Sequence, residues 1–363
     1  MKKKILLVAE RRDEFLDWVA EIFKKEYDIK IFSQHEYFGP APGIISRLWN
    51  LHNSFLKLVV KEKPEKIFVY GKAFTTIWLF IFFIRLRGLK TEIIVYRYDI
   101  ENFRSYSGSF TEKIGHFITR FLEKYCMINA HKIVHKGLSN ELEFLSFYPK
   151  LRKKKHYLFR EFIDRKMIVP FDLKKKLSFK DRETHLVLIG QLPLLKVDYA
   201  DTIWEFYPRI TTQKIHLHVY MKIPNETIER FKEIEKENRY FHFHGYLERK
   251  KLIAETSKYD YGLFVTSRNS GKKINYFVMT AMGFRIFDYI LAHVPVIACN
   301  EAQAVSEFVN TNKVGFSMPN ADTPRIGTIL KKNSGKYKET ISNIDKTLKR
   351  FSDFDDFLDF IRN

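Results

Sequence analysis

The sequence predicts an α/β protein of two domains, each built on a parallel sheet with helices wound on both faces. Short apolar runs of strand length alternate with segments of helical periodicity along both halves of the chain, and this alternation is typical of strand–helix–strand units. The length of 363 residues favours two domains over one. A hydrophobic content of 45%, with 16% aromatic residues, is ample for packed cores.

In the first half, helices with one apolar face separate short apolar strands. Residues 14–25, for example, place Phe15, Trp18 and Ile22 on one side of a helix. The expected strands are 4–9, 29–32, 66–70, 92–96 and 132–135, and the expected helices are 14–25, 45–61, 74–87 and 110–128.

The second half repeats this plan after a basic, irregular stretch at 151–182. The expected strands are 184–189, 215–220, 240–244, 261–265 and 294–298, and the expected helices are 199–207, 226–236, 248–257, 285–291 and 304–309. We therefore expect an N-terminal domain at 1–165, a C-terminal domain at 183–335 and a helical tail at 336–363 that packs back on the N-terminal domain. Ligands of open α/β sheets bind at the carboxyl ends of the strands, so the site is expected in the cleft between the two sheets.

The formal net charge of +20 indicates an anionic partner, either a phosphorylated substrate, a membrane surface or a nucleic acid. The basic clusters are scattered and lack an interleaved aromatic motif, so nucleic acid is not expected. Two cysteines make no disulfide framework, and no secretory signal opens the chain, which favours the cytoplasm. Residues 73–84 form a run of twelve mostly apolar residues, short of the about 20 that span a bilayer. It is either a core helix or an interfacial helix that docks on an anionic membrane.

The segment 283–298 is the most informative in the chain. It reads Gly-Phe-Arg-Ile-Phe-Asp-Tyr-Ile-Leu-Ala-His-Val-Pro-Val-Ile-Ala. Arg285 and Asp288 are three residues apart, so they share one face of a helix. A cation beside a helix N-terminus suits a diphosphate, and a carboxylate suits the diol of a ribose.

This segment resembles the donor-binding signature of GT-B glycosyltransferases, which have two Rossmann-like domains, and above all that of the retaining "group 1" class. Arg285 falls on the basic position of the signature and Asp288 on its acidic position, while Tyr289, Ala292 and Pro295 match as well. The resemblance implies that both charged residues bind the donor.

Two further segments resemble donor-binding elements of the same family. Residues 188–196 resemble a strand–glycine–loop element in which Gly190 and Lys196 match the family, while Gln191 replaces an arginine that contacts phosphate. In residues 241–252 the backbone at Tyr246 and Leu247 corresponds to the part that holds the nucleotide base.

The remaining matches are fainter, and some positions depart from the family. Asp99 stands where relatives carry an acid that faces the donor sugar or the acceptor. Ser270 and Gly271 lie in a loop expected to meet the donor phosphates or sugar. Thr280 replaces the first acid of a Glu-x(7)-Glu pair, and His293 stands where the family favours glycine. The missing first acid at Thr280 and the replacement of arginine by Gln191 leave an inactive transferase open.

The resemblance implies transfer of a sugar from a nucleotide-diphosphate sugar to an acceptor hydroxyl, with retention of configuration. Arg285 and Lys196 would stabilise the departing diphosphate, and Asp99 would act near the reacting sugar. No cofactor or metal is expected, because these enzymes do not in general need one. The pairs His216/His218 and His242/His244 each share one face of a strand, but a metal site would require further placed ligands.

The basic charge and the run at 73–84 indicate a glycan or lipid-linked acceptor, with the protein attached peripherally to the inner face of the membrane. Two alternatives stay open. The first is a nucleotide-sugar epimerase on the same fold, which would convert the donor without an acceptor. The second is a non-catalytic basic protein that binds membranes or nucleic acid with strong salt dependence.

Overall fold

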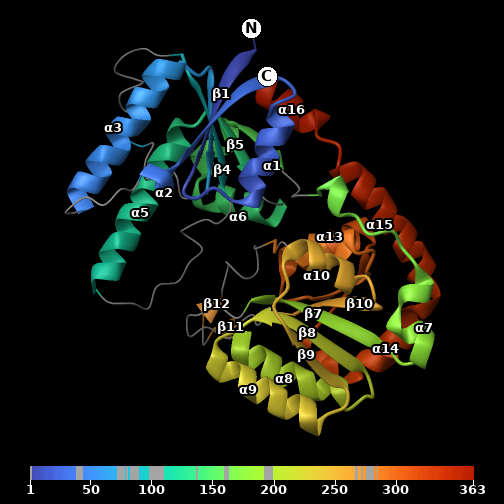
Figure 1. Cartoon of the computed structure of the whole chain (residues 1–363). Coiled ribbons are helices and arrows are strands. Elements are labelled where there is room, and N and C mark those ends of the chain that lie inside the picture. Colours follow the sequence, from blue (N-terminus) through green and yellow to red (C-terminus); the bar gives the residue numbers. More distant parts are fainter. Residues whose placement is uncertain are drawn as a thin grey trace. The chain divides into compact units, whose positions relative to one another are not determined.

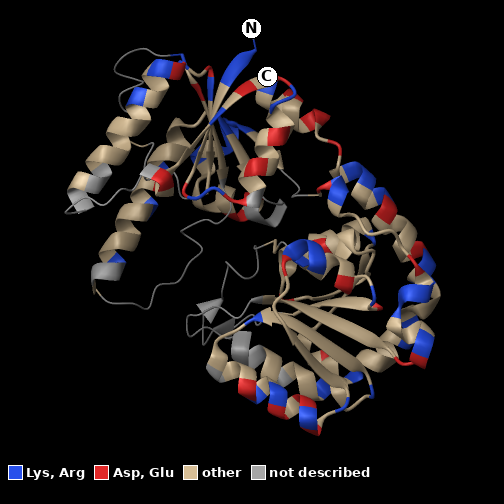
Figure 2. Ribbon diagram, viewed as in Figure 1, with Lys and Arg blue, Asp and Glu red and all other residues tan. Residues whose placement is uncertain are grey.

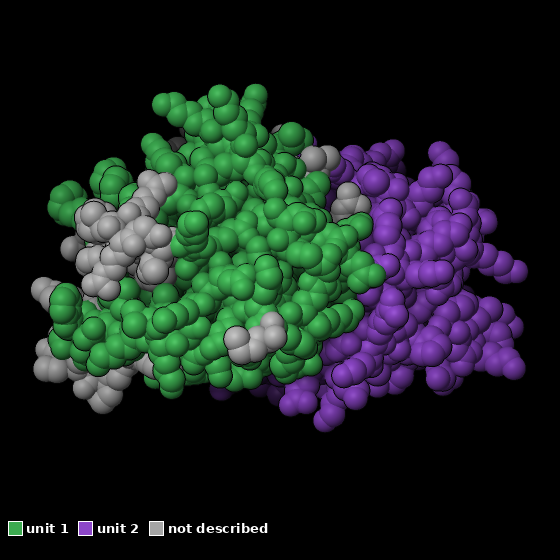
Figure 3. All heavy atoms as spheres, turned by 90° about the horizontal axis from the view of Figure 1, so that it is seen from above, with its two compact units in different colours: residues 1–160, 354–363 green, residues 161–353 purple. Residues whose placement is uncertain are grey.

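The computed structural model describes the following residues: 2–37, 44–71, 78, 81, 90–97, 110–135, 138–158, 163–191, 199–265, 269–270, 273–274, 282–283 and 285–363. They form two compact units, which Figure 3 colours separately. Unit 1 comprises Met1–Arg160 with Phe354–Asn363, and unit 2 comprises Glu161–Asp353.

Unit 1 is a parallel six-stranded sheet in the order β2-β1-β3-β4-β5-β6 (Figure 1). The strands are β1 (Lys3–Ala9), β2 (Tyr27–Ser33), β3 (Lys66–Tyr70), β4 (Glu92–Arg97), β5 (Lys132–His135) and β6 (Lys155–Leu158). The helices are α1 (Glu14–Phe23), α2 (Gln34–Tyr37), α3 (Ile44–Glu62), α5 (Phe110–Asn129), α6 (Leu138–Phe147) and α16 (Asp355–Arg362). The interior strand β1 is apolar and fully buried from Leu6 to Ala9, as expected for a parallel strand covered on both faces. Asp13 caps α1 by accepting a 2.8 Å hydrogen bond from the backbone N–H of Leu16.

The last helix, α16, belongs to unit 1. The ammonium groups of Lys66 and Lys132 donate hydrogen bonds to backbone carbonyls of its final turn, at 3.3 and 3.1 Å. Cations are favourable there because the carbonyls at a helix C-terminus lack partners within the helix. Glu92 forms ion pairs with both lysines, and the ring of Phe357 stacks on Phe23 at 5.7 Å between centroids.

Unit 2 is also a parallel six-stranded sheet, in the order β14-β13-β10-β7-β8-β9. Its strands are β7 (His185–Gln191), β8 (His216–Lys222), β9 (Phe241–Gly245), β10 (Tyr261–Phe264), β13 (Val296–Cys299) and β14 (Gly315–Met318), with a separate antiparallel pair β11 (Asn269–Ser270) and β12 (Lys273–Ile274). Its α-helices are α7 (Leu177–Asp181), α8 (Tyr199–Thr211), α9 (Asn225–Glu237), α10 (Arg249–Thr256), α12 (Arg285–Leu291), α13 (Gln303–Asn312), α14 (Ile326–Asn333) and α15 (Tyr337–Phe351).

Two hydrophobic cores cover the faces of this sheet. Alternate residues of β7 enter different cores, because successive side chains of a strand point to opposite faces. Val187 and Ile189 pack with α10, α12 and α15, whereas Leu186 and Leu188 pack with α8 and α9.

The predicted fold class is confirmed: both halves are parallel α/β sheets, and all ten predicted strands are present within about two residues at each end. The structure adds β6, inside the stretch predicted to be irregular, and β14. The predicted tail at 336–363 divides between α15 in unit 2 and α16 in unit 1. Most of the expected helix at 74–87 lies outside the described residues. Among the described helices, none is long and apolar enough to cross a membrane.

Candidate functional site

The first part of the candidate site is Arg285, the first residue of α12. Its guanidinium donates a 3.2 Å hydrogen bond to the carbonyl of Ile189, near the carboxyl end of β7. It also lies over the ring of Phe264, at the end of β10, with 4.6 Å between the guanidinium carbon and the ring centroid. Arg285 therefore stands at the carboxyl edge of the unit 2 sheet, where ligands of such sheets bind.

A glycine on β7 makes room for this guanidinium. A Cβ atom on Gly190 would lie 2.9 Å from Nη1 of Arg285 and 3.4 Å from its Cδ. Among the described residues, Ile189 is the hydrogen-bond partner of Arg285, and a guanidinium carries five N–H donors. The remaining donors suit an anionic ligand such as a phosphate.

Asp288 lies one turn further along α12 and is almost completely buried. Its Oδ1 accepts a 2.8 Å hydrogen bond from Nε of Arg249, the first residue of α10, and the two side chains form an ion pair. The two charged residues of the predicted signature thus have different partners. Arg249 was missed by the sequence analysis, although it lies within the segment 241–252 already identified as a donor-binding element.

Tyr289 fixes α12 to the sheet. Its hydroxyl accepts a 3.0 Å hydrogen bond from the N–H of Ile189 on β7 and donates a 2.9 Å hydrogen bond to the carbonyl of Leu263 on β10. A Cβ atom on Gly262 would lie 2.3 Å from the tyrosine ring, so this close approach requires glycine. Complete burial raises the pKa of Tyr289, which therefore stays neutral and holds Arg285 and Asp288 in place.

His293 occupies the position where the family favours glycine. Its φ of +52° is in the left-handed region, which explains the family preference and which histidine adopts more readily than most residues. The ring nitrogens lie 2.6 Å from the carbonyl oxygen of Val169 and 2.8 Å from a carboxylate oxygen of Asp345 on α15. The departure from glycine therefore has a structural role, because the histidine joins α12 to α15.

The other predicted donor residues divide between described and undescribed parts of the chain. Tyr246 is exposed and stands beside Lys222, whose ammonium lies 5.8 Å from the ring centroid. Leu247 is half-buried against the core that contains α12. Gln191 ends β7 and Ser270 ends β11. The remaining predicted positions, namely Asp99, Lys196, Gly271 and Thr280, lie outside the described residues.

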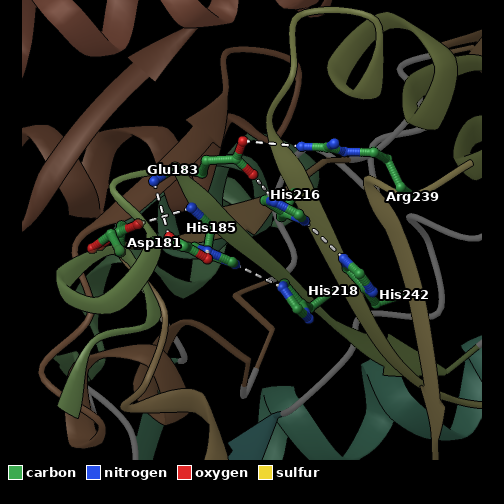
Figure 4. A network of polar contacts seen from close by, with 9 residues as sticks. Asp181, Glu183, His185, His216, His218, Arg239 and His242 are labelled. Carbon is green, nitrogen blue, oxygen red and sulfur yellow. Dashed lines mark hydrogen bonds and ion pairs between the residues drawn. The ribbon is translucent and has the colours of Figure 1, made fainter.

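A second polar cluster lies at the opposite, amino-terminal side of the same sheet (Figure 4). In one series, Asp181 accepts a 2.9 Å hydrogen bond from His185. The other ring nitrogen of His185 lies 2.9 Å from a ring nitrogen of His218, and the other ring nitrogen of His218 lies 2.9 Å from a ring nitrogen of His244. A parallel series runs from Glu183 through His216 to His242, the last step at 2.8 Å.

The rings of these two series stack on each other. The His185 and His216 rings are 4.5 Å apart and within 7° of parallel, and the His218 and His242 rings are 4.4 Å apart. Burial, followed by repulsion from neighbouring histidines, lowers the pKa of His218, and the same causes lower that of His242 to about 4. The rings of His218 and His242 are therefore neutral at pH 7.

Ligand atoms of His185, His216 and His218 are close enough together to consider a metal ion. Metal ligands direct their nitrogen lone pairs at one point. The parallel rings of His185 and His216 do not converge in this way, and their nitrogens are already engaged in hydrogen bonds. This cluster is better described as a hydrogen-bonded network than as a metal centre.

Comparison with known proteins supports the sequence-based interpretation. Residues 206–352 match the family model described as "Glucosyltransferase 3-like, C-terminal domain". The search of curated proteins found no match.

Solved structures match nearly the whole chain. The lipopolysaccharide outer core galactosyltransferase WaaB in its apo form matches at 10% identity and a TM-score of 0.65, covering 94% of this chain and 95% of that one. An alpha-glucosyltransferase in complex with UDP-glucose and DNA containing an abasic site matches at 11% identity and a TM-score of 0.61, covering 99% of each. A UDP-N-acetylglucosamine 2-epimerase matches at 12% identity and a TM-score of 0.55, covering 94% and 91%.

At these identities the likeness shows the fold, which is GT-B, and the predicted resemblance to GT-B glycosyltransferases is confirmed. The family match includes Arg249, Arg285, Asp288 and Tyr289. The C-terminal domain is thus glucosyltransferase-like, and both comparisons support a glycosyltransferase.

Proposed function

We propose that this protein transfers a sugar from a nucleotide-diphosphate sugar to an acceptor hydroxyl, and that unit 2 binds the donor. The observation that carries the proposal is the position of Arg285. It lies at the carboxyl edge of a parallel sheet, on a helix within the segment that matches a glucosyltransferase-like family. The GT-B fold and a structural relative solved with UDP-glucose are consistent with such a donor.

In the proposed reaction, Arg285 binds the diphosphate of the donor. Negative charge develops on the diphosphate as the bond to the sugar breaks, and a guanidinium held in place beforehand stabilises that charge. The contacts with Ile189 and Phe264 hold the guanidinium before the donor arrives. Lys196 adds a second cation in this proposal, and Asp99 acts near the reacting sugar.

Asp288 is proposed to bind the ribose diol. Arg249 holds this side chain by an ion pair, and carboxylate oxygens accept hydrogen bonds from hydroxyl groups. Arg249 is therefore proposed as a positioning residue that acts through Asp288. Tyr246 and Leu247 are proposed to lie beside the base, and Gly190, Gln191, Ser270 and Gly271 beside the phosphates or sugar.

Unit 1 is proposed to bind the acceptor, a glycan or a lipid-linked molecule, at the inner face of the membrane. Retention of anomeric configuration and independence of metal and cofactor are further parts of the proposal, and both are based on the family resemblance.

Thermal stabilisation by UDP, GDP, ADP, TDP and CMP tests the donor site. A ligand at 100 times its Kd raises the unfolding free energy by about 2.7 kcal/mol, which is easily measured as a shift in Tm. We expect one diphosphate to stabilise the wild type selectively and to lose this effect in Arg285→Met and in Asp288→Asn. Asparagine preserves the volume of the buried aspartate, and a cooperative unfolding transition of each variant without nucleotide checks that it is folded. Stabilisation of both variants equal to that of the wild type would contradict the site.

The epimerase alternative is favoured by the matches to structures described as UDP-N-acetylglucosamine 2-epimerases, one of them putative. The stabilising nucleotide defines which nucleotide sugars to test. An epimerase converts its nucleotide sugar into an epimer in the absence of an acceptor, which NMR of the anomeric protons detects. We expect no epimer, and its formation would replace the transferase proposal.

A further inference from the structure

The first half of α5 exposes large apolar side chains. Phe110 is 78% exposed, Phe117 71% and Phe121 61%, and Ile114 and Ile118 are also exposed. Toward the end of the helix Cys126 and Met127, which lie on another face, are buried in unit 1, whereas Ile128 is 47% exposed. Figure 1 shows the beginning of α5 extending beyond the ends of the strands of unit 1. Such contiguous apolar surface on a folded protein marks an interaction site.

These side chains form a single stripe. Counted from Phe110, the residues Ile114, Phe117, Ile118 and Phe121 follow at separations of 4, 7, 8 and 11 residues, all sums of three and four, which places them on one face of the helix. Three aromatic rings and two branched aliphatic side chains on about three turns give a surface that can enter an apolar phase.

Basic residues border this stripe on one side. Lys113, Arg120 and Lys124 are exposed and lie three or four residues from Phe117 or Phe121. Glu123 is buried, and the described exposed residues of α5 include no carboxylate. Figure 2 shows α5 mostly tan with blue positions along it. We call the five apolar and three basic residues the α5 surface.

We propose that the α5 surface docks unit 1 onto an anionic lipid bilayer. The apolar stripe would enter the boundary between headgroups and acyl chains while the basic border contacts anionic headgroups. Nucleic acid is a poorer fit, because isoleucine side chains cannot stack on bases as aromatic rings do. A second copy is a poorer fit as well, because pairing two such stripes brings the basic borders together, and the described exposed residues of α5 offer no carboxylate to match them.

This inference deepens the proposed function, since a lipid-linked acceptor lies at that boundary. The docking element proposed here is α5, whose residues are described, and not the interfacial helix considered at 73–84. Membrane docking by α5 does not depend on donor chemistry, so the two proposals can fail separately.

Sedimentation of the full-length protein with lipid vesicles tests the docking surface. Vesicles of phosphatidylcholine with phosphatidylglycerol are compared with phosphatidylcholine alone, at low and high salt. We expect binding to the anionic vesicles that weakens as salt increases. Phe117→Ser/Phe121→Ser should lower the partition coefficient at least about tenfold, because two large apolar side chains no longer enter the bilayer. Lys113→Gln/Arg120→Gln/Lys124→Gln should lower it about 100-fold at low salt, because each of the three cations near an anionic surface contributes roughly fivefold.

A matched control is Leu142→Ser/Leu173→Ser, which removes two exposed leucines from elsewhere on the protein. It should bind vesicles as the wild type does, and all variants should keep the wild-type Tm and the nucleotide-dependent stabilisation. Wild-type partition of the Phe117/Phe121 variant, or equal loss in the control, would overturn the proposal. Light scattering that shows a dimer dissociated by the same variant, without vesicle binding by the wild type, would assign the surface to a second copy instead. If the wild type bound vesicles but no nucleotide stabilised it, the result would count against the donor site alone.

Discussion

Replacing Gly190 by alanine should weaken donor binding by displacing Arg285 while leaving the fold intact. The new methyl carbon would lie 2.9 Å from Nη1 of the guanidinium, whereas unstrained contacts of this kind are about 3.5–4.0 Å. The guanidinium must therefore move by about 0.5–1 Å. The atoms that move are the far end of a flexible side chain, so the free energy of unfolding should change by less than about 1 kcal/mol.

The loss of affinity follows from the contact that is displaced. A hydrogen bond to a charged group contributes about 1.5–3 kcal/mol. Its complete loss corresponds to about 10–150-fold in Kd, and a partial displacement to about tenfold. Isothermal titration calorimetry with the stabilising nucleoside diphosphate measures this change. Gly335→Ala is the matched control, because no atom lies within 4 Å of a Cβ at that position.

A double-mutant cycle separates displacement of Arg285 from direct obstruction of the ligand. If the methyl group acts through the guanidinium, Gly190→Ala should cost almost nothing further in an Arg285→Met background. An unchanged Kd in Gly190→Ala, or the same loss in both backgrounds, would refute the assignment of this contact.

Three further predictions concern stability. Tyr289→Phe should lower the free energy of unfolding by about 1–3 kcal/mol in urea titrations, because the buried N–H of Ile189 loses its acceptor; a change under about 0.5 kcal/mol would contradict this. Because the pKa values of His218 and His242 are lowered in the folded protein, the unfolded state binds more protons than the folded state. The contribution of the two histidines to the free energy of unfolding is therefore complete above their unfolded pKa of 6.5 and is lost as the pH falls toward about 4. The Tm should therefore decrease between pH 7 and 5, less steeply in His242→Gln, and a Tm independent of pH would argue against a neutral histidine network. Deletion of Phe354–Asn363 should destabilise unit 1 by at least about 3 kcal/mol, because α16 buries several large apolar side chains there; a calorimetric trace identical to that of the wild type would exclude this role.

Most of the fold could be predicted from the sequence, because strand and helix periodicity are properties of neighbouring residues. The buried run of β1 and the amphipathic pattern of α1 each carry their own signal within about ten residues. The short strands β6 and β14 were not predicted, since four residues with mostly half-buried side chains give little periodicity.

The fact that sequence patterns report only on neighbouring residues also explains how far the candidate site could be predicted. Arg285 and Asp288 were identified because they lie one turn apart on one short helix. The ion pair of Asp288 with Arg249, 39 residues earlier, could not be read from spacing, because it depends on how α10 and α12 pack. The role of Tyr289 was likewise hidden, since its hydroxyl contacts two strands that are neighbours only in the folded sheet.

The sequence by itself determined two parallel α/β sheets, a signature on α12 that resembles the donor-binding segment of GT-B glycosyltransferases, and a strongly basic chain. Only the tertiary structure decided which residues accompany that signature, how His185, His218 and His244 from three strands align in one network, and that α16 packs with unit 1. The physical reason is that periodicity reports contacts within a turn of helix or along a strand. Contacts between distant segments depend on strand register and on the packing of helices against the sheet, which the whole chain sets together.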